Sequence, residues 1–204
     1  FERLSRKLFI TEAGMKLLSY ARHAVSLFNE MEENMKGIAG KINLRIGATV
    51  TVGTCVLNDI LKAYEVKHPE VNTQEFVQNT SSIEEMILKN DLDIGVIEGE
   101  IKNPDIFKIP IISDELVLVC SSSHKFANFE NVDITELQNL DFILREKGSG
   151  TRELFERALE NAKVTINEKW VCNNSEAIKN AVINGQGLTV ISKMLVEKEL
   201  KNKK

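Results

Sequence analysis

The sequence predicts an α/β fold in which a long amphipathic helix precedes two lobes built on parallel-rich sheets. Apolar residues with heptad spacing occupy the segment before Gly40. After Gly40, segments with strand and helix patterns alternate, which is typical of parallel sheets with crossover helices. The polar stretch 121–124 interrupts this alternation, and we expect the chain to cross there from the first lobe to the second.

The long helix is expected to begin after Thr11, whose side chain can cap the first turn, and to end at Gly37. It would be about 40 Å long at roughly 1.5 Å per residue, which is long for a core helix. Its apolar residues follow the steps of a coiled-coil seam: Leu17, Ala21, Ala24, Phe28, Met31, Met35 and Ile38. We therefore predict a dimerisation helix over residues 11–39, with packing against its own domain as the alternative.

The first lobe is expected over residues 41–118. Its elements, in order, are a strand from Ile42 to Ile46, a helix over 56–64 that stops at His68 and Pro69, a strand over 71–78, a short helix opened by a capping box of Ser82 and Glu85, and a buried strand over 94–97. Apolar runs at 107–112 and 116–120 follow.

The second lobe is expected over residues 119–204. Its elements, in order, are a strand over 142–144, a helix over 151–162, a strand over 169–172, a helix over 175–184, a strand over 188–191 and a final helix from Lys193.

The composition, with 204 residues of which 43% are hydrophobic and 27% charged, is that of a globular protein. The net charge of −4 argues against nucleic-acid binding by the chain as a whole, because phosphate contacts need a basic surface. The exception is a local basic group that could contact DNA phosphates: Arg3, Arg6 and Lys7. The alternative interpretation of this group is a solvated charged turn. No apolar run approaches the ~20 residues that span a bilayer, and no leader begins the chain, so we expect a cytoplasmic protein without membrane contact.

An enzyme or a metalloprotein is not favoured. The widely spaced Cys55, Cys120 and Cys172 lack a CxxC motif, which leaves buried thiols as the main interpretation and a redox-sensing pair as the alternative. The histidines form no evident grouping with a serine or cysteine nucleophile. We expect no catalytic residues, no metal and no cofactor.

Two turns between a strand and a helix, at 48–53 and 147–152, form the candidate ligand site. Helix N-termini present free N–H groups there, at the strand ends where α/β sheets bind ligands, and hydroxyls and glycines suit a small anion. The candidates are Thr49, Val50, Thr51, Gly148, Ser149, Gly150, Thr151 and Arg152, the last as a partner for a carboxylate. The alternative is that the hydroxyls only cap their own helices.

Weaker candidates for the same cleft follow two other strands. Asn79 and Thr80 come after the strand at 71–78, with a turn and a helix cap as the alternative. Glu98 comes after the strand at Ile94, and here a solvated loop is the favoured interpretation.

Residues 1–14, including Arg3, Arg6 and Lys7, resemble the wing of a winged helix-turn-helix, with a wing remnant at 1–10, and the linker helix of LysR-type transcriptional regulators. Motifs that resemble the effector-binding domain of this family follow in order at 46–49, 93–96, 115–119, 145–152 and 177–187. The resemblance implies a two-lobed, periplasmic-binding-protein-like effector domain behind a dimerisation helix, with an effector bound in the cleft between the lobes.

The resemblance also implies a DNA-binding regulator of transcription that forms homodimers or homotetramers and responds allosterically to a small metabolite, which the polar turns predict to be anionic. It implies a helix-turn-helix upstream of Phe1 that reads bases, while Arg3, Arg6 and Lys7 contact the DNA backbone. It further implies that a strand and a helix beyond Lys204 complete the first lobe. A solute-binding protein of a membrane transporter is the alternative, although it predicts an export signal and no dimerisation helix.

Overall fold

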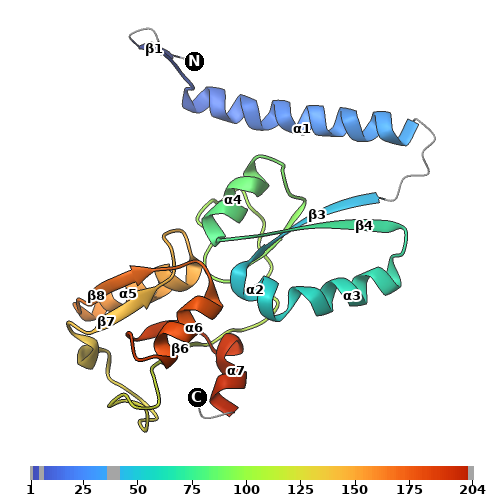
Figure 1. The fold of residues 1–204 in the computed structure, drawn as a ribbon. Helices are drawn as coiled ribbons and strands as arrows, with labels where there is room; N and C mark the ends of the chain where they lie inside the picture. Colours follow the sequence, from blue (N-terminus) through green and yellow to red (C-terminus); the bar gives the residue numbers. More distant parts are fainter. Residues whose placement is uncertain (1, 5–6, 36–41, 202–204) are drawn as a thin grey trace.

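In a computed structural model, a long helix leads into an α/β body with two lobes (Figure 1). The structure describes residues 2–4, 7–35 and 42–201. Strands β1 (Glu2–Leu4) and β2 (Lys7–Phe9) pair as an antiparallel hairpin before the helix. Arg3 and Lys7 lie in these strands, whereas Arg6, Gly37 and Ile38 lie outside the described residues.

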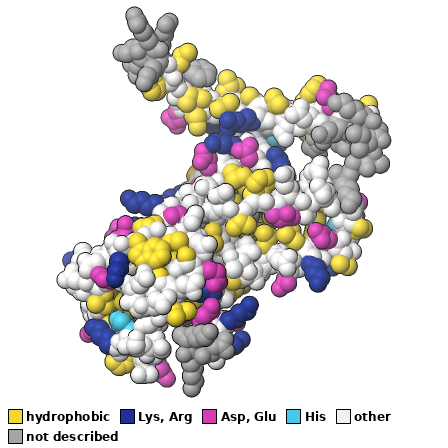
Figure 2. Space-filling model, in the orientation of Figure 1, with side chains coloured by type: hydrophobic (Ala, Val, Ile, Leu, Met, Phe, Trp, Pro, Cys, Tyr) yellow, Lys and Arg dark blue, Asp and Glu magenta, His cyan; other side chains and the backbone are white. Residues whose placement is uncertain are grey.

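The long helix α1 (Glu12–Met35) begins where the sequence predicts, because Thr11 Oγ1 accepts a hydrogen bond from the Gly14 amide at 3.1 Å. The described residues of its expected seam lie on the surface, with Leu17 69% and Met35 81% exposed, and Figure 2 shows hydrophobic side chains along this helix. The helix contacts the body through Ser19, whose Oγ donates to the Leu88 carbonyl at 3.2 Å. The seam is thus free to meet another surface.

Lobe I is a parallel sheet with β3 (Ile42–Thr49) between β4 (Val71–Gln78) and β5 (Ile94–Val96). Its helices are α2 (Val50–Cys55), α3 (Leu57–Lys67) and α4 (Thr80–Leu88). Ile46 and Ala48 of β3 pack with Val52 and Leu57 as the core of this lobe. The bounds expected for β4 are confirmed, but β5 is not buried, since Ile94 at this sheet edge is 48% exposed.

The cap of α4 differs from the expected capping box of Ser82 and Glu85. Asn79 is the N-cap, and its side chain accepts a hydrogen bond from the Ser82 amide at 3.0 Å. The helix therefore begins three residues earlier, which places Ser82 inside the first turn and leaves Glu85 to pair with Lys89 one turn later.

Lobe II contains two strand pairs. Strand β6 (Leu116–Val119) pairs antiparallel with β9 (Thr189–Ser192), and β7 (Asp141–Leu144) pairs parallel with β8 (Asn167–Val171). A parallel bridge between Phe142 and Leu188 connects β7 to the start of β9. The helical elements are a 3-10 turn at Ile134–Leu137, α5 (Gly150–Ala162), α6 (Ser175–Ile183) and α7 (Lys193–Lys201).

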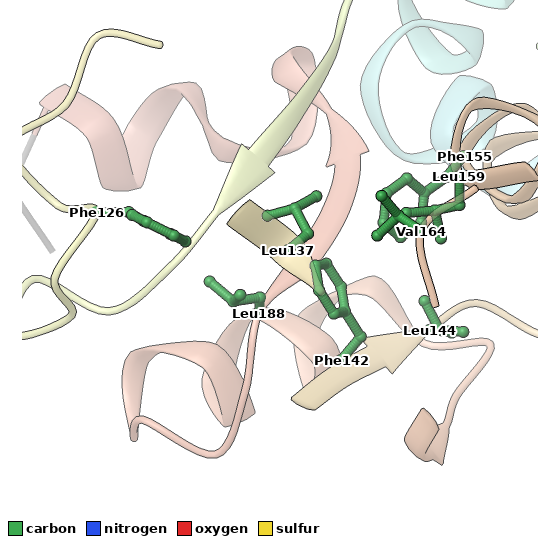
Figure 3. Packing of buried hydrophobic residues seen from close by; sticks show 8 residues of the cluster. All are labelled: Phe126, Leu137, Phe142, Leu144, Phe155, Leu159, Val164 and Leu188. Carbon is green, nitrogen blue, oxygen red and sulfur yellow. The ribbon is translucent and has the colours of Figure 1, made fainter. Parts of the chain in front are cut away.

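The main core of lobe II lies between β7 and α5 (Figure 3). The ring centroids of Phe142 and Phe155 are 5.2 Å apart, and both side chains are buried. A smaller cluster joins the lobes, because Ile191, Leu195 and Val196 pack against Cys55 of α2.

The chain enters lobe II earlier than expected. Because β6 pairs with β9, residues 116–118 lie with the strands of lobe II, and the expected crossing at 121–124 comes after that entry. The preceding segment, 97–115, has no regular strand or helix, and its Phe107 is 87% exposed. The pairing with β9 joins residues about seventy positions apart and is not visible in the local pattern of 116–120. In the described parts of the chain, no helix has the length and apolar content to cross a membrane.

Candidate functional site

The two lobes meet at the carboxylate of Glu98, in the loop after β5. Its Oε1 accepts a hydrogen bond from Thr51 Oγ1 of α2 at 2.7 Å and another from Thr151 Oγ1 of α5 at 2.9 Å. Thr51 belongs to lobe I and Thr151 to lobe II, and both are buried. One carboxylate oxygen therefore bridges the lobes.

The backbone of Glu98 extends this contact. Its amide donates to Thr49 Oγ1 at 3.2 Å, and its carbonyl accepts from Thr80 Oγ1 at 3.2 Å. Thr80 Oγ1 in turn accepts from the Gly150 amide of lobe II at 3.0 Å. A Cβ on Gly150 would lie 2.7 Å from the Glu98 carbonyl oxygen, so only glycine permits this approach.

A second contact between the lobes runs through Gly148. The Ser81 amide, in the first turn of α4, donates to the Gly148 carbonyl at 3.1 Å. A Cβ on Gly148 would lie 3.4 Å from Asn79 Oδ1, and its φ of +88° also favours glycine. The predicted residues of the turn at 147–152 and those after β4 thus lie side by side.

The environment of Glu98 is unusual for an acid. Burial raises the pKa of its carboxyl, the hydrogen bonds from Thr51 and Thr151 and the charge of Arg145 lower it, and the charge of Asp114 raises it, so that the net pKa lies above its usual range. Its Oε2 is buried and has no hydrogen-bond partner among the described residues. The favoured interpretation of Glu98 as a solvated loop residue is therefore wrong.

A cavity of about 350 Å³ opens between α2 of lobe I and the start of α6 in lobe II, and Glu98, Thr51 and Thr151 are not among its lining residues. It is lined by Val50, Thr54, Asn173, Asn174, Ser175 and Glu176. Ser175 is 5% exposed, and its Oγ has no partner among the described residues. Sequence reasoning missed the residues of α6, although they follow β8 at the same edge where the other candidates follow their strands.

Another cavity, of about 300 Å³, lies within lobe II near Ser121, His124 and Gly187 and contains none of the predicted residues.

Ser149 is buried at the N-cap of α5 without a side-chain capping bond. Within the described residues, no group of His, Cys, Asp and Glu could hold a metal ion. The two thiols of Cys55 and Cys120 have pKa values raised first by burial, which makes them weak nucleophiles.

Arg152 does not face the cleft as a free donor. Its Nε donates to Glu156 at 2.7 Å, its Nη1 to the Arg145 carbonyl at 2.9 Å and its Nη2 to Glu168 at 2.6 Å. The side chain is 6% exposed. These bonds all lie within lobe II, so Arg152 connects α5 to β8 and its donors are already used within the protein.

Replacing Arg152 by methionine is expected to destabilise the protein by about 1–3 kcal/mol, because the buried Arg145 carbonyl loses its donor. Urea unfolding measures the loss. Arg157→Met is the matched control, since Arg157 is 46% exposed and pairs with an exposed Glu100, and such solvent-screened pairs contribute little to stability. Equal losses for the two variants would contradict the structural role of Arg152.

Comparisons with known proteins agree with this architecture. The family described as LysR substrate binding domain matches residues 41–204. The HTH-type transcriptional regulator CysL of Bacillus subtilis (strain 168) is 31% identical over 93% of this chain and 64% of its own length. The HTH-type transcriptional regulator YeiE of Escherichia coli (strain K12) is 30% identical over 98% of this chain and 67% of its own. The chain thus spans about two thirds of the length of these curated relatives.

Solved structures give the same fold. The regulatory domain of CcmR from Synechocystis PCC6803, in complex with 2-PG, matches with a TM-score of 0.71 and 27% identity over 76% of this chain and 74% of that chain. Full-length BenM, as an E226K mutant, matches with a TM-score of 0.68 and 20% identity over 96% of this chain and 66% of that chain, which shows the fold alone.

Proposed function

This chain belongs to the LysR family of transcriptional regulators, and on that premise we propose that its two lobes bind a small anionic metabolite in the cleft between them and thereby control transcription allosterically. The observation that carries the proposal is the bridge from Thr51 through Glu98 to Thr151, in which hydroxyls from both lobes already hold a carboxylate oxygen. The relatives are named as regulators of transcription, not as enzymes or transporter components.

The chemistry of the cleft supports an anion. The N-terminus of α6 lines the cavity from lobe II, and helix N-termini favour negative charge. The cavity of about 350 Å³ is at the small end of the range for ligand sites, which suits a compact metabolite. The complex of CcmR with 2-PG is a related regulatory domain that holds a small molecule.

Helix α4 gives this site a mechanical connection to α1. The first turn of α4 contacts lobe II through Thr80 and Ser81. At the other end, the Leu88 carbonyl accepts from Ser19 of α1 at 3.2 Å, and Asn90 Nδ2 donates to the Ser19 carbonyl at 3.4 Å. A change in the arrangement of the lobes would therefore move α1, provided that the effector binds the two arrangements with different affinity.

The exposed seam of α1 supports pairing with a second copy of the chain, as a homodimer or as part of a homotetramer. DNA would be contacted in the cytoplasm through the wing-like segment that holds Arg3, Arg6 and Lys7, with the effector acting on the spacing of paired DNA-binding units.

A thermal-shift screen against sulfate, phosphate and small carboxylates tests the proposed function. An anion that binds only the native protein at 100 times its Kd stabilises by about 2.7 kcal/mol, which is a rise in Tm of roughly 5–10 °C for a chain of this size. Asn173→Tyr should abolish the shift by filling the cavity, because Asn173 lines it and is exposed. Thr49 and Ser149 are both buried, so bulky residues there would disturb the fold instead.

Asn58→Tyr is the matched control for the screen, since Asn58 is also exposed but lies on α3 and does not line the cavity. It should keep the shift of the unmodified chain. A panel without any saturable stabilisation, or a full shift in Asn173→Tyr, would refute an anion site in this cleft.

A further inference from the structure

Resting on the proposed function, we infer that the carboxylate of Glu98 is a built-in competitor of the effector, holding the hydroxyls of Thr51 and Thr151 until an anion displaces it. Glu98 then sets two properties of the site. It ties the lobes together, and it makes the binding of an anion depend on the uptake of a proton.

The competition follows from the number of donors. A threonine hydroxyl carries one hydrogen and can donate to one acceptor at a time. The hydroxyls of Thr51 and Thr151 both donate to Glu98 Oε1, at 2.7 and 2.9 Å. Thr51 is 0% and Thr151 2% exposed, so no solvent face of either side chain offers a second approach. An effector that uses these hydroxyls must take them from Glu98.

The negative charge of ionised Glu98 opposes the binding of an anion further. An anion beside an ionised Glu98 would place two negative charges in a poorly solvated site, which is costly unless one of them is neutralised. Glu98 can take up a proton at Oε2, which is buried and has no donor among the described residues. Protonation removes the repulsion and weakens the hold of Glu98 on both hydroxyls, because hydrogen bonds to a charged acceptor are about twice as strong as neutral ones.

The groups that surround this carboxylate include hydrogen-bond donors and one cation, which suit an anion, and one further carboxylate, which opposes it. They are the hydroxyls of Thr51 and Thr151, the thiol of Cys55 on α2, the guanidinium of Arg145 after β7 and the carboxylate of Asp114 before β6. Arg145 is 3% exposed and gives Nε and Nη2 to Glu146, while its buried Nη1 has no acceptor in the described parts of the chain. Its charge is shared with Glu146, but its Nη1 remains as a donor for an anion bound when Glu98 is neutral.

The direction of the pH effect follows from the raised pKa of Glu98. As pH rises from the usual pKa of a glutamate through the raised value, the folded protein must ionise Glu98 in a buried site, and the proton needed for anion binding becomes harder to hold. Anion affinity should therefore fall with rising pH, by up to about tenfold per unit for one linked proton. A cation bound beside Glu98 would show the opposite dependence, because it favours the ionised carboxylate.

Titration calorimetry with sulfate, at constant ionic strength between pH 5 and 8, tests the inference. Sulfate stays fully ionised over this range, so any pH dependence belongs to the protein. We expect Glu98→Gln to bind sulfate roughly tenfold more tightly than the unmodified chain at pH 8, with little pH dependence and without proton uptake. Glu98→Ala should bind sulfate at least as tightly as Glu98→Gln, because it leaves no side-chain oxygen to compete for the two hydroxyls.

Two controls locate the effect. Glu100→Gln removes one negative charge only two positions away, at an exposed residue that pairs with Arg157, and should leave sulfate affinity and its pH dependence unchanged. Thr151→Val combined with Glu98→Gln removes one hydroxyl and should lose at least the gain in affinity. A purely structural role for Glu98 would alter stability without altering proton uptake.

The outcomes separate this inference from the proposed function. Failure of both Glu98 variants to bind sulfate, or binding with the same affinity and pH dependence as the unmodified chain, would overturn the competitor role of Glu98. The proposed function would survive that result if other anions still stabilised the unmodified chain and lost their effect in Asn173→Tyr. An unresponsive anion panel in the thermal-shift screen would overturn both.

Discussion

Replacing Gly150 by alanine is expected to open the contact between the lobes while leaving each lobe folded. The added Cβ would lie 2.7 Å from the Glu98 carbonyl oxygen, 2.9 Å from Thr80 Oγ1 and 3.0 Å from the Gly99 Cα. Two of these atoms are backbone, so a side-chain rotation cannot relieve the clash. Alanine suits the first turn of α5 at least as well as glycine, and the helix itself is not weakened.

Small-angle scattering should report a larger radius of gyration for Gly150→Ala, and the affinity for the anions of the thermal-shift screen should fall at least about tenfold, or 1.4 kcal/mol. Ser149→Ala is the matched control, because it changes the neighbouring buried residue without adding atoms and removes no side-chain cap. If Gly150→Ala kept the radius and the affinity of the unmodified chain, the close approach at Gly150 would not govern the arrangement of the lobes.

Replacing Phe142 by alanine is expected to cost about 3–5 kcal/mol of unfolding free energy, a large share of the 5–15 kcal/mol typical of a domain. Phe142 is 0% exposed in the middle of β7 and stacks near Phe155 of α5, so the substitution leaves a cavity in the main core of lobe II (Figure 3).

Guanidinium unfolding followed by circular dichroism measures this loss. Phe107→Ala removes the same ring from a residue that is 87% exposed, and its effect should stay within about 0.5 kcal/mol. A loss below about 1 kcal/mol for Phe142→Ala would mean that the core of lobe II repacks around the vacated volume.

Local patterns predicted most of the secondary structure. The strand at 71–78 and the final helix from Lys193 begin where expected, because each has a clear period and a clear boundary. The prediction of a capping box at Ser82 and Glu85 was wrong because Asn79 and Ser82 are both residues that favour the N-cap position. Which of them caps the helix depends on which backbone amide reaches the side chain. The strand β6 lies within the apolar run expected at 116–120, but its pairing was not predictable because its partner β9 is remote in sequence.

The candidate site was predictable to the extent that strand ends define it. Thr49 and Thr80 follow neighbouring strands of the lobe I sheet, which brings them to one edge beside Glu98. Gly150 follows β7 of lobe II and reaches this edge through its hydrogen bond to Thr80. The role of Glu98 was not predictable, because its burial depends on Thr151 in the other lobe. The partners of Arg152 were not predictable either, because Glu168, one of them, comes from β8.

The short length of α4 limits how far its end at Leu88 moves when the helix tilts. At roughly 1.5 Å per residue, its nine residues make a rod of about 13 Å, so a tilt of about 10° at Thr80 would displace Leu88 by about 2 Å. The bonds to Ser19 measure 3.2 and 3.4 Å and are already near the limit of useful hydrogen-bond length. They cannot absorb such a displacement by stretching. A tilt of α4 would therefore either move α1 with it or break the two hydrogen bonds at Ser19.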